Sequence, residues 1–433
     1  MMNFVRRNAL LLILLLSLLL RGAAAVYLGD EVVVLPGTSD QLSYHHLALR
    51  VLDGHGFSFG EDWWPATRAD EPTAHWSFLY TFYLVAVYGI FGPHPLAARL
   101  LQAVIVGLLQ PWLIYQLGRQ LFNQKVGLWA ALLTAVYAYF IYYAATLMTE
   151  PFYISAILGA LLLAIRLARP PEVRGNRLLL SLALGLTLGI AVLLRQLFLL
   201  LIPFLLAWMF WASLRGHAHL RLIHYALPVV VVVAMVVPFS LYNAQRFGQF
   251  VLLNTNSGYA FFWGNHPYYG THFQPILSEE EYLSLLPVDQ LYLDEAALDK
   301  ELLRRGMQFV FDDPGRYLQL SLSRIPAYFE FLPSAESGTL SNLSRVLSFG
   351  ILWPFMLIGL ILAWRRRSHR FWDALATPKF LLVLFALVYT GIHVLTWTLI
   401  RYRLPVDAVL LVFAGVTFDW IATFLFSRGK QPG

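Results

Sequence analysis

The chain has 433 residues, of which 58% are hydrophobic and only 13% carry a charge, about half of the charged fraction that is typical of soluble domains. Several apolar runs approach the roughly 20 residues that span a bilayer, so the sequence predicts an all-α polytopic membrane protein rather than a soluble domain or an outer-membrane barrel. The net charge of +6 does not indicate a nucleic-acid partner, because the basic residues lie in short loops between hydrophobic runs; the lack of cysteine excludes disulfides, thiol chemistry and cysteine-ligated zinc.

The first apolar run, residues 9–20, follows Arg6 and Arg7, and we expect a membrane helix over residues 8–28. The small residues that follow this run would also suit cleavage of a signal peptide, but we favour retention of the helix. In both cases residue 30 and those after it are expected to lie outside the cell.

Residues 29–95 form the first large outer segment, which contains the apolar stretch 76–91. If that stretch crossed the membrane, the first inner basic loop would move outside and Glu150 would move inside. If it instead lies along the outer interface, the basic residues of the short loops all fall inside, as the positive-inside rule requires. These residues are Arg119, Lys125, Arg166, Arg169, Arg174, Arg177, Arg215, Arg221, Arg365, Arg366, Arg367, Arg370, Arg428 and Lys430.

This topology gives about ten transmembrane helices plus interfacial helices in the first outer loop, with both termini in the cytoplasm. The expected spans are 8–28, 96–118, 126–147, 151–168, 178–194, 197–213, 224–243, 346–364, 379–397 and 404–425. The chain thus divides into an amino-terminal catalytic transmembrane module (1–243), an extracytoplasmic loop with short helices (244–345) and carboxyl-terminal transmembrane helices (346–433). We expect a multi-pass protein of the plasma (inner) membrane.

The loop 244–345 does not have the composition of a plain linker. Its part 254–275 is rich in aromatic residues, Gly, Asn and His, which is typical of an ordered loop. In 278–311, Leu, Tyr and Val are spaced among acidic residues, which predicts one or two amphipathic helices. The sequence Asp-Asp-Pro-Gly at 312–315 interrupts that pattern.

Ionisable residues are almost absent from the middle of the predicted spans, which disfavours an ion-coupled transporter. The outer helix ends, by contrast, carry two acids, Asp40 and Glu150, together with four arginines. These arginines are Arg99, Arg195, Arg401 and Arg403. Because the planar guanidinium binds two phosphate oxygens at once, the pattern suits a substrate with a phosphate and a hydroxyl to activate. The short inner loops and the lack of a glycine-rich phosphate loop disfavour a nucleotide sugar, which leaves a lipid phosphate as donor.

Five short motifs occur in order and are all expected at or near the ends of predicted spans. They are Asp40 with Tyr44-His-His-Leu-Ala, Phe91-Gly with Ala97-Ala-Arg99-Leu, Leu117-Gly-Arg-Gln-Leu-Phe122, Met148-Thr-Glu150-Pro, and Arg401-Tyr-Arg-Leu-Pro405. With these motifs the chain resembles the membrane-embedded C-type glycosyltransferase superfamily. It is most similar to the bacterial relatives of protein O-mannosyltransferases and of the lipid A aminoarabinose transferase.

The resemblance implies transfer of a sugar from a polyprenyl-phosphate donor, usually with inversion. By position, Asp40 matches the acid of the first loop and Glu150 the acid after the third span. The sequence also departs from the family. Gln41 stands where mannosyltransferases have the second acid of an Asp-Glu pair, and the pair Asp30-Glu31 upstream competes for that role. No large soluble carboxyl-terminal domain is seen, so we expect a lipid or glycan acceptor rather than a protein.

Each candidate site residue has a functional and a structural interpretation. Asp40 would act as the general base on the acceptor hydroxyl, or it begins a helix. Glu150 would position the acceptor or share a divalent metal with Asp40, or its acid simply favours the first turn of a helix that begins at Pro151. The four arginines would bind the donor phosphate, or they extend along apolar surface to the interface.

Four further residues are candidates for substrate binding: Tyr44, His45, Tyr259 and Trp263. The aromatic residues of the second loop would stack on a sugar or cover the lipid entrance, and ordinary packing within the loop is the alternative. No cofactor is required by the pattern, and a divalent metal is left open. A histidine metal site is not expected, because His45 and His46 point to different faces of a helix.

Three alternatives to the transferase remain. A transporter or flippase of lipid-linked glycans would move lipid without consuming a donor. A glycan polymerase or ligase would use a pyrophosphate-linked donor. A non-catalytic relative would bind polyprenyl lipid alone.

Overall fold

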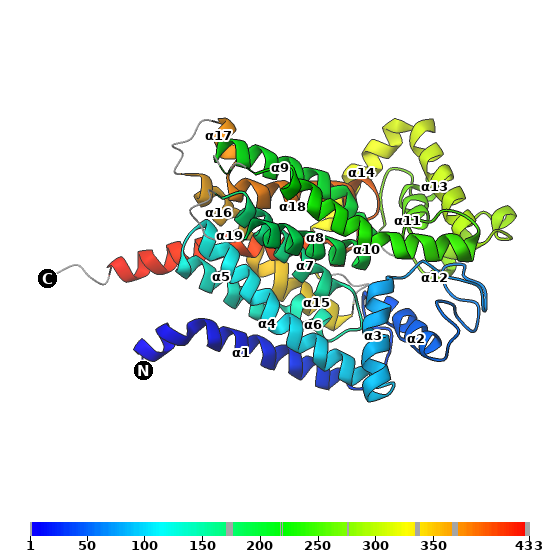
Figure 1. The fold of residues 1–433 in the computed structure, drawn as a ribbon, viewed down its shortest axis with the longest axis horizontal. Coiled ribbons are helices and arrows are strands. Elements are labelled where there is room, and N and C mark those ends of the chain that lie inside the picture. The colour runs from blue at the N-terminus through cyan, green and yellow to red at the C-terminus, as the bar shows by residue number, and fades with distance from the viewer. Residues whose placement is uncertain are drawn as a thin grey trace.

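The computed structural model describes residues 2–169, 176–216, 218, 220–274, 277–333, 338–365 and 371–428. Over these residues the chain is helical, and the β structure that occurs in them is two isolated bridges between residues 58 and 72 and between 63 and 67. Figure 1 shows the long helices running along one axis, with both termini at the same end of the bundle.

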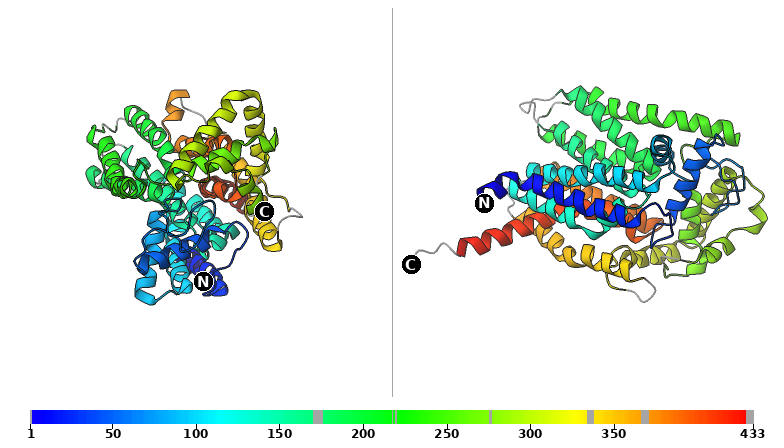
Figure 2. Two further views of the ribbon diagram at one scale, coloured as in Figure 1. Left: turned by 90° about the vertical axis from the view of Figure 1, so that its right-hand side faces the viewer. Right: turned by 90° about the horizontal axis from the view of Figure 1, so that it is seen from below.

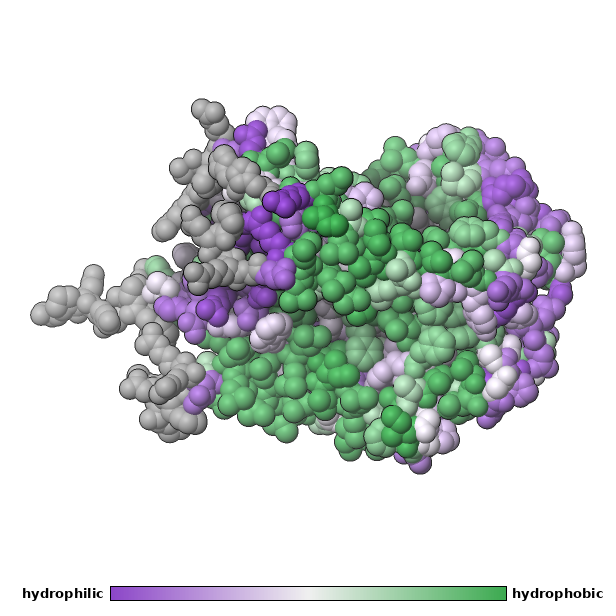
Figure 3. All heavy atoms as spheres, in the orientation of Figure 1, coloured by the Kyte–Doolittle hydropathy of each residue, from purple (hydrophilic) through white to green (hydrophobic). Residues whose placement is uncertain are grey.

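The membrane bundle is formed by helices that are long and apolar. They are α1 (Met2–Leu28), α4 (Pro95–Leu121), α5 (Gln124–Val136), α6 (Ala138–Ala144), α7 (Glu150–Leu167), α8 (Arg177–Leu194), α9 (Ile202–Arg215), α10 (Ile223–Phe247), α16 (Ile351–Arg365), α18 (Pro378–Leu395) and α19 (Leu404–Arg428). Nine segments of the described chain are long and apolar enough to cross a membrane, and the bent pair α5–α6 makes a tenth. The prediction of an all-α polytopic membrane protein with about ten spans is confirmed. Figure 3 shows the apolar surface over the middle of the molecule.

Close packing of these helices depends on glycines where two backbones meet. A Cβ atom on Gly118 of α4 would lie only 2.8 Å from the Cα of Gly127 on α5. A Cβ on Gly359 of α16 would collide with the carbonyl oxygen of Phe413 on α19. Small residues allow this approach in membranes, where van der Waals contact rather than water exclusion holds helices together.

The span predicted over 126–147 is instead two helices, with a bend of 56° between α5 and α6. The break falls at Tyr137, whose φ and ψ angles of −66° and 112° are extended. Its hydroxyl donates to the carboxylate of Asp407 at 2.6 Å, and the amide of Tyr139 donates to Ser348 at 3.0 Å. Contacts from the distant carboxyl-terminal part of the chain therefore replace the helical hydrogen bonds at this point.

Arg21, deep in α1, is fully buried, and its guanidinium binds the end of α5 where the span breaks. Its guanidinium donates to the carbonyl oxygens of Thr134 at 3.1 Å and Ala135 at 3.2 Å, and to Ser17 at 2.6 Å. Those carbonyls belong to the last turn of α5, where no later amide of the same helix can reach them. The arginine thus satisfies polar groups that would be costly to leave unpaired inside a membrane.

The two large segments lie together at the other end of the bundle, which we call the loop end. The first contributes α2 (Asp40–Leu52) and α3 (Phe78–Phe91), and the second contributes α11 (Ser257–Asn265), α12 (Glu279–Ser284), α13 (Glu295–Asp312), α14 (Pro314–Tyr328) and α15 (Thr339–Arg345). Figure 1 shows α3 running across the bundle rather than along it, and its 14 residues are too few to span a membrane.

Glu295, at the start of α13, joins the two large segments into one unit. Its buried carboxylate accepts hydrogen bonds from the Thr67 hydroxyl at 2.6 Å, from the Ala74 amide at 2.8 Å and from the Thr255 hydroxyl. One helical turn on, Asp299 accepts from the amides of Gly258 and Tyr259 at the start of α11. These acids hold the backbone that leads to the site described below.

Most short basic loops lie at the opposite end, with the termini. Figure 2 shows the same separation from below, with the chain ends far from the loop end. Five of the basic residues used in the topology prediction lie outside the described residues: Arg174, Arg366, Arg367, Arg370 and Lys430.

Candidate active site at the loop end

Four charged side chains from distant parts of the sequence meet at the loop end. Arg195 Nη2 lies 2.5 Å from Glu150 Oε1, and Arg401 Nη1 lies 2.9 Å from Asp40 Oδ2. Arg401 Nε is 3.7 Å from the same oxygen of Glu150. The four residues, which we call the charge cluster, therefore form a chain in which acids and arginines alternate.

Each member of the cluster lies at a break between helices. Asp40 is the first residue of α2, and Ser39 before it makes no capping hydrogen bond with its side chain. Glu150 is the first residue of α7, where the positive end of the helix dipole favours a carboxylate. Arg195 is extended between α8 and the 3-10 helix η1 (Gln196–Leu201), and Arg401 lies in the 3-10 helix η5 (Ile400–Arg403).

The two carboxylates differ in exposure. The Glu150 side chain is 2% exposed and is held by both arginines. The Asp40 side chain is 20% exposed and has one charged partner, Arg401. Glu150 therefore fixes the positions of two cations, whereas Asp40, the more exposed carboxylate with one charged partner, is the better placed to accept a proton from a bound hydroxyl.

Aromatic rings pack against the guanidiniums of Arg195 and Arg401. The guanidinium of Arg195 lies over the rings of Tyr402 at 4.9 Å and Tyr153 at 5.5 Å, and that of Arg401 lies 5.4 Å from the Tyr402 ring. His393 of α18 stacks on the ring of Tyr402 at a centroid distance of 4.7 Å. The sequence interpretation did not select Tyr402, although it stands between the two arginines of the last motif.

Arg99, predicted to bind the donor phosphate, lies elsewhere. It is 1% exposed, and its guanidinium donates to the carbonyls of Leu28 at 3.1 Å and Gly29 at 2.5 Å and to Gln41 at 3.4 Å. These carbonyls belong to the end of α1, where the last carbonyls lack helical partners. The contacts of Arg99 are therefore those of a helix cap.

Arg403 also lies apart from the charge cluster. It is fully buried, pairs with Asp407 at 3.0 Å and donates to the carbonyls of Tyr328 and Glu330. Because Arg401 and Arg403 are two residues apart on a 3-10 helix, which turns by about 120° per residue, their side chains point in different directions. Arg403 anchors the end of the second large segment to α19.

Tyr44 and His45, the two candidate substrate-binding residues of α2, lie on different faces of that helix. Tyr44 is one turn after Asp40, and its hydroxyl accepts from the Ser77 amide at 3.4 Å. Burial raises the pKa of Tyr44, and the charge of Asp40 raises it further. His45 points to another face, where it contacts the Tyr88 hydroxyl at 2.9 Å, and burial lowers its pKa to about 4.

Tyr259 and Trp263 are each 1% exposed and belong to the apolar core of the second large segment. Trp263 stacks on Trp64 at 5.5 Å and donates to the Tyr282 carbonyl at 3.0 Å. Neither ring is exposed in this structure, and stacking on a sugar stays a prediction for both residues. The alternative of ordinary loop packing is what the structure shows.

A divalent metal shared by Asp40 and Glu150 does not fit the geometry. The guanidinium of Arg401 lies between the two carboxylates and contacts both. Among the described residues no group of three or more His, Asp or Glu side chains could hold a metal ion. No step proposed below is therefore routed through a metal.

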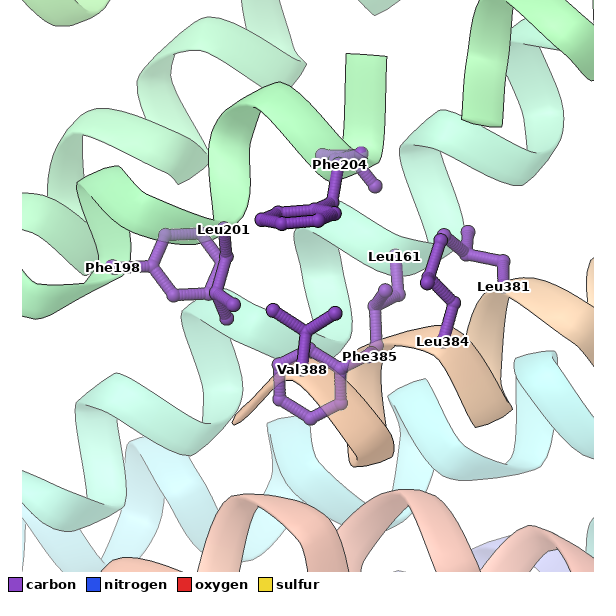
Figure 4. A pocket seen from close by; sticks show the side chains of 10 residues that line it. Leu161, Phe198, Leu201, Phe204, Leu381, Leu384, Phe385 and Val388 are labelled. Atoms are coloured by element: carbon purple, nitrogen blue, oxygen red, sulfur yellow. The ribbon is translucent and has the colours of Figure 1, made fainter. Parts of the chain in front are cut away.

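A small apolar groove lies between α7, η1, α9 and α18, and its lining contains no residue of the charge cluster. Figure 4 shows its lining, which includes Leu161, Phe198, Phe204, Leu384 and Val388. A second apolar cavity shares two lining residues with it and continues toward the opposite end of the bundle.

The groove reaches the charge cluster through neighbouring rings. The Phe198 ring lies 6.0 Å from that of Tyr153, which in turn lies against Arg195. The Phe385 ring in the groove lining lies 5.4 Å from Tyr389, which is on the same side of α18 as His393. The groove therefore lies beside the aromatic residues that surround the charge cluster.

Comparison with known proteins agrees with this architecture. Residues 73–242 match the family model described as dolichyl-phosphate-mannose-protein mannosyltransferase, whereas no curated protein matches the sequence. The fold is similar to that of an Archaeoglobus fulgidus oligosaccharyltransferase in the apo form, with 19% identity and a TM-score of 0.59 over 97% of this chain and 51% of that chain. It is also similar to apo ArnT from Cupriavidus metallidurans, with 15% identity and a TM-score of 0.59 over 98% of this chain and 62% of that one.

A third similar structure is the archaeal oligosaccharyltransferase AglB from A. fulgidus in complex with an inhibitory peptide and a dolichol-phosphate. It has 17% identity and a TM-score of 0.58 over 99% of this chain and 52% of that chain. The chain thus spans about half the length of the oligosaccharyltransferases that it matches. The predicted resemblance to C-type glycosyltransferases is confirmed, and at these identities the solved structures establish the fold.

Proposed function

We propose that the protein is a glycosyltransferase that moves a sugar from a polyprenyl-phosphate donor to the hydroxyl of a lipid or glycan acceptor. The observation that carries this proposal is the charge cluster, in which Asp40, Glu150, Arg195 and Arg401 meet at the loop end. The match to a mannosyltransferase family model and the dolichol-phosphate in the AglB structure support it.

The reaction would take place on the extracytoplasmic face of the plasma (inner) membrane. The support for this orientation is the excess of basic residues in the short loops at the end opposite the charge cluster, which the positive-inside rule assigns to the cytoplasm. Both termini, at that same end in Figure 1, would then be cytoplasmic.

The donor would bind with its phosphate at Arg195 and Arg401 and its polyprenyl chain along the groove. Each guanidinium already has a carboxylate and an aromatic ring to fix its plane, so little side-chain freedom would be lost on binding. The groove would contribute through burial of apolar surface, at roughly 25 cal/mol per Å².

In the transfer step Asp40 would take the proton of the acceptor hydroxyl. The oxygen would attack the anomeric carbon from the face opposite the phosphate, the bond between that carbon and the phosphate oxygen would break, and polyprenyl phosphate would leave. Attack from the opposite face inverts the configuration. The arginines would stabilise the negative charge of the leaving phosphate, and Glu150 would hold them in place.

Arg401 would couple donor binding to the base. In the structure it pairs with Asp40 at 2.9 Å, so a phosphate that binds Arg401 competes with that pair. Binding of the donor would therefore free the Asp40 carboxylate to face the acceptor, which predicts that the donor binds first.

The decisive experiment measures release of polyprenyl phosphate by the purified protein from a panel of polyprenyl-phosphate sugars and pyrophosphate-linked glycans. Cell-envelope extract supplies the acceptor, and Asp40→Asn is compared with wild type. The matched control is Asp30→Asn, because Asp30 is an exposed acid of the same segment that hydrogen-bonds to the Leu96 amide outside the cluster.

Release by wild type and Asp30→Asn but not by Asp40→Asn is the expected result. Loss in Asp30→Asn with retention in Asp40→Asn would move the base to the upstream pair. Use of pyrophosphate-linked donors alone would identify a polymerase or ligase. A folded protein that releases nothing from any donor would contradict the proposal and favour a flippase or a lipid-binding protein.

A further inference from the structure

Helix α14 of the second large segment has an exposed apolar stripe. Leu318, Leu322 and Ile325 are 59%, 54% and 40% exposed, and their spacing of four and three residues places them on one face of the helix. A second face, with Leu320 and Arg324, is buried against the protein. The stripe is therefore free of the protein core.

The position of α14 is fixed by the end of a membrane helix. The hydroxyl of Tyr317 donates to the carbonyl of Leu395 at 3.0 Å, and Arg324 donates to the carbonyl of Val394 at 3.0 Å. Both carbonyls belong to the last turn of α18, a candidate membrane span that ends at Leu395. Helix α14 thus lies at the level where this span leaves the apolar part of the membrane.

The apolar surface continues from the span onto this helix. On α18, Leu387 and Leu395 are 65% and 47% exposed on the outside of the bundle. At the turn before α14, Phe311 is 71% exposed. Figure 1 shows α13 and α14 standing out from the loop end as a lobe, which leaves their outer faces free of the bundle.

No acidic side chain on the helix opposes this placement. Between Pro314 and Tyr328 there is no acidic residue, and the guanidiniums of Arg316 and Arg324 are bound to carbonyl oxygens of the protein. In water, these three apolar side chains would remain partly exposed, which is unfavourable. In the headgroup region of a membrane they would be buried among acyl chains.

We propose that α14 is a membrane-surface helix that inserts Leu318, Leu322 and Ile325 into the lipid leaflet at the loop end. Phe311 would mark the outer limit of the same contact. The helix lies on the end of α18, which lines the apolar groove through Leu384 and Val388. Lipid contact by α14 would therefore fix the height of the second large segment beside that groove, whether or not the protein transfers a sugar.

Because the chain contains no cysteine, single labels can test this placement directly. Leu322→Cys and, at an exposed polar position on α12, Glu280→Cys would each carry an environment-sensitive fluorophore. The full-length protein would be reconstituted in vesicles of phosphatidylethanolamine and phosphatidylglycerol. Quenching by lipids with spin labels in their acyl chains is then compared with quenching by aqueous iodide.

The label at residue 322 is expected to show blue-shifted emission and several-fold stronger quenching by the acyl-chain labels than by iodide. The label at residue 280 should show the reverse preference. Equal access of iodide to both positions, without acyl-chain quenching at residue 322, would overturn the proposal and place the lobe in water. Because both residues are exposed, neither change should disturb folding, which thermal unfolding of the labelled proteins checks.

Discussion

Exposure separates the two acids of the charge cluster, because Asp40 is open to solvent whereas Glu150 is enclosed by arginines. Asp40→Asn keeps the shape of the side chain and removes its ability to take a proton. We expect kcat to fall by about 10²–10⁴-fold, the usual contribution of general-base catalysis. The KM for the donor should not rise, because the phosphate no longer competes with the Asp40–Arg401 ion pair, and thermal unfolding should stay close to that of wild type.

Glu150→Gln should instead change stability and the KM for the donor. It leaves Arg195 with no carboxylate in a buried site, and breaking such a pair costs about 3–5 kcal/mol. We expect a lower unfolding temperature and a higher KM for the donor, because both guanidiniums lose the group that orients them. Steady-state kinetics and thermal unfolding on the same preparation measure both. A Glu150→Gln protein with wild-type stability and donor KM but no turnover would make Glu150 a base instead.

Arg401 and Arg99 are both predicted to bind the donor phosphate, but we expect their substitution to have different effects. Arg401→Ala should weaken donor binding, measured as displacement of a labelled polyprenyl phosphate, because Arg401 lies in the cluster. Arg99→Ala should leave donor binding unchanged and lower stability by about 1–3 kcal/mol for each carbonyl left without a partner. Reduced donor affinity in a folded Arg99→Ala protein would restore Arg99 to the phosphate site.

From the sequence, both acids and all four arginines are predicted near helix ends. The sequence does not tell which of them lie together in the charge cluster. Arg401 and Arg403 belong to one motif, and only a 3-10 turn sends one to the cluster and the other to Asp407. Tyr259 and Trp263 have the residue types of a sugar platform, yet Tyr259 packs against His75, and Trp263 packs against Trp64 and Tyr282. Such choices depend on contacts between segments that are far apart in the chain.

At the scale of helices, apolar run length predicts where most spans lie, and contacts from distant residues decide where they break. The pattern over 126–147 has no proline that would mark the bend at Tyr137. The hydrogen bond to Asp407, 270 residues away, holds that bend. Arg21 is the one hint in the sequence, because a buried cation in a membrane helix needs acceptors.

The attachment of α13 to α11 should depend on pH. Burial raises the pKa of Asp299 to about 7, whereas an exposed aspartate titrates near 3.9. Between these values the folded protein binds a proton that the unfolded chain has lost, so stability is greatest below about pH 4 and declines as pH rises to about 7. The full effect is of the order of 4 kcal/mol for a shift of about three units.

Asp299→Asn removes this dependence while its side-chain oxygen can still accept from the amides of Gly258 and Tyr259. We expect the unfolding temperature of the variant to exceed that of wild type at pH 8 and to approach it at pH 5. Thermal unfolding across this range measures the difference. An equal difference at both pH values would show that the carboxyl does not titrate there.

At the scale of the whole molecule, composition predicts the fold class, and the distribution of arginine and lysine predicts its orientation. The bundle axis, the two large segments at one end and the termini at the other are visible in Figure 1, but the direction in the membrane rests on the basic loops. Orientation matters for mechanism, because a cytoplasmic cluster would meet nucleotide donors and an extracytoplasmic one would not.

The lack of cysteine makes this orientation testable in cells. Glu280→Cys on α12 and Lys125→Cys at the start of α5 introduce thiols at exposed positions on opposite ends of the bundle. A membrane-impermeant maleimide added to intact cells should label residue 280 at once and residue 125 only after the membrane is permeabilised. The unmodified chain, which has no thiol, provides the background.

The reverse labelling would invert the bundle and place Asp40 in the cytoplasm. The charge cluster and groove would be unchanged in such a protein, but a cytosolic nucleotide sugar could then reach the site. Labelling of both positions in intact cells would show that one of these segments crosses the membrane differently, with the stretch at α3 the first to re-examine. In the expected orientation the basic loops face the cytoplasm and the charge cluster lies on the extracytoplasmic side. A donor embedded in the leaflet can reach the cluster there, whereas a cytosolic nucleotide cannot.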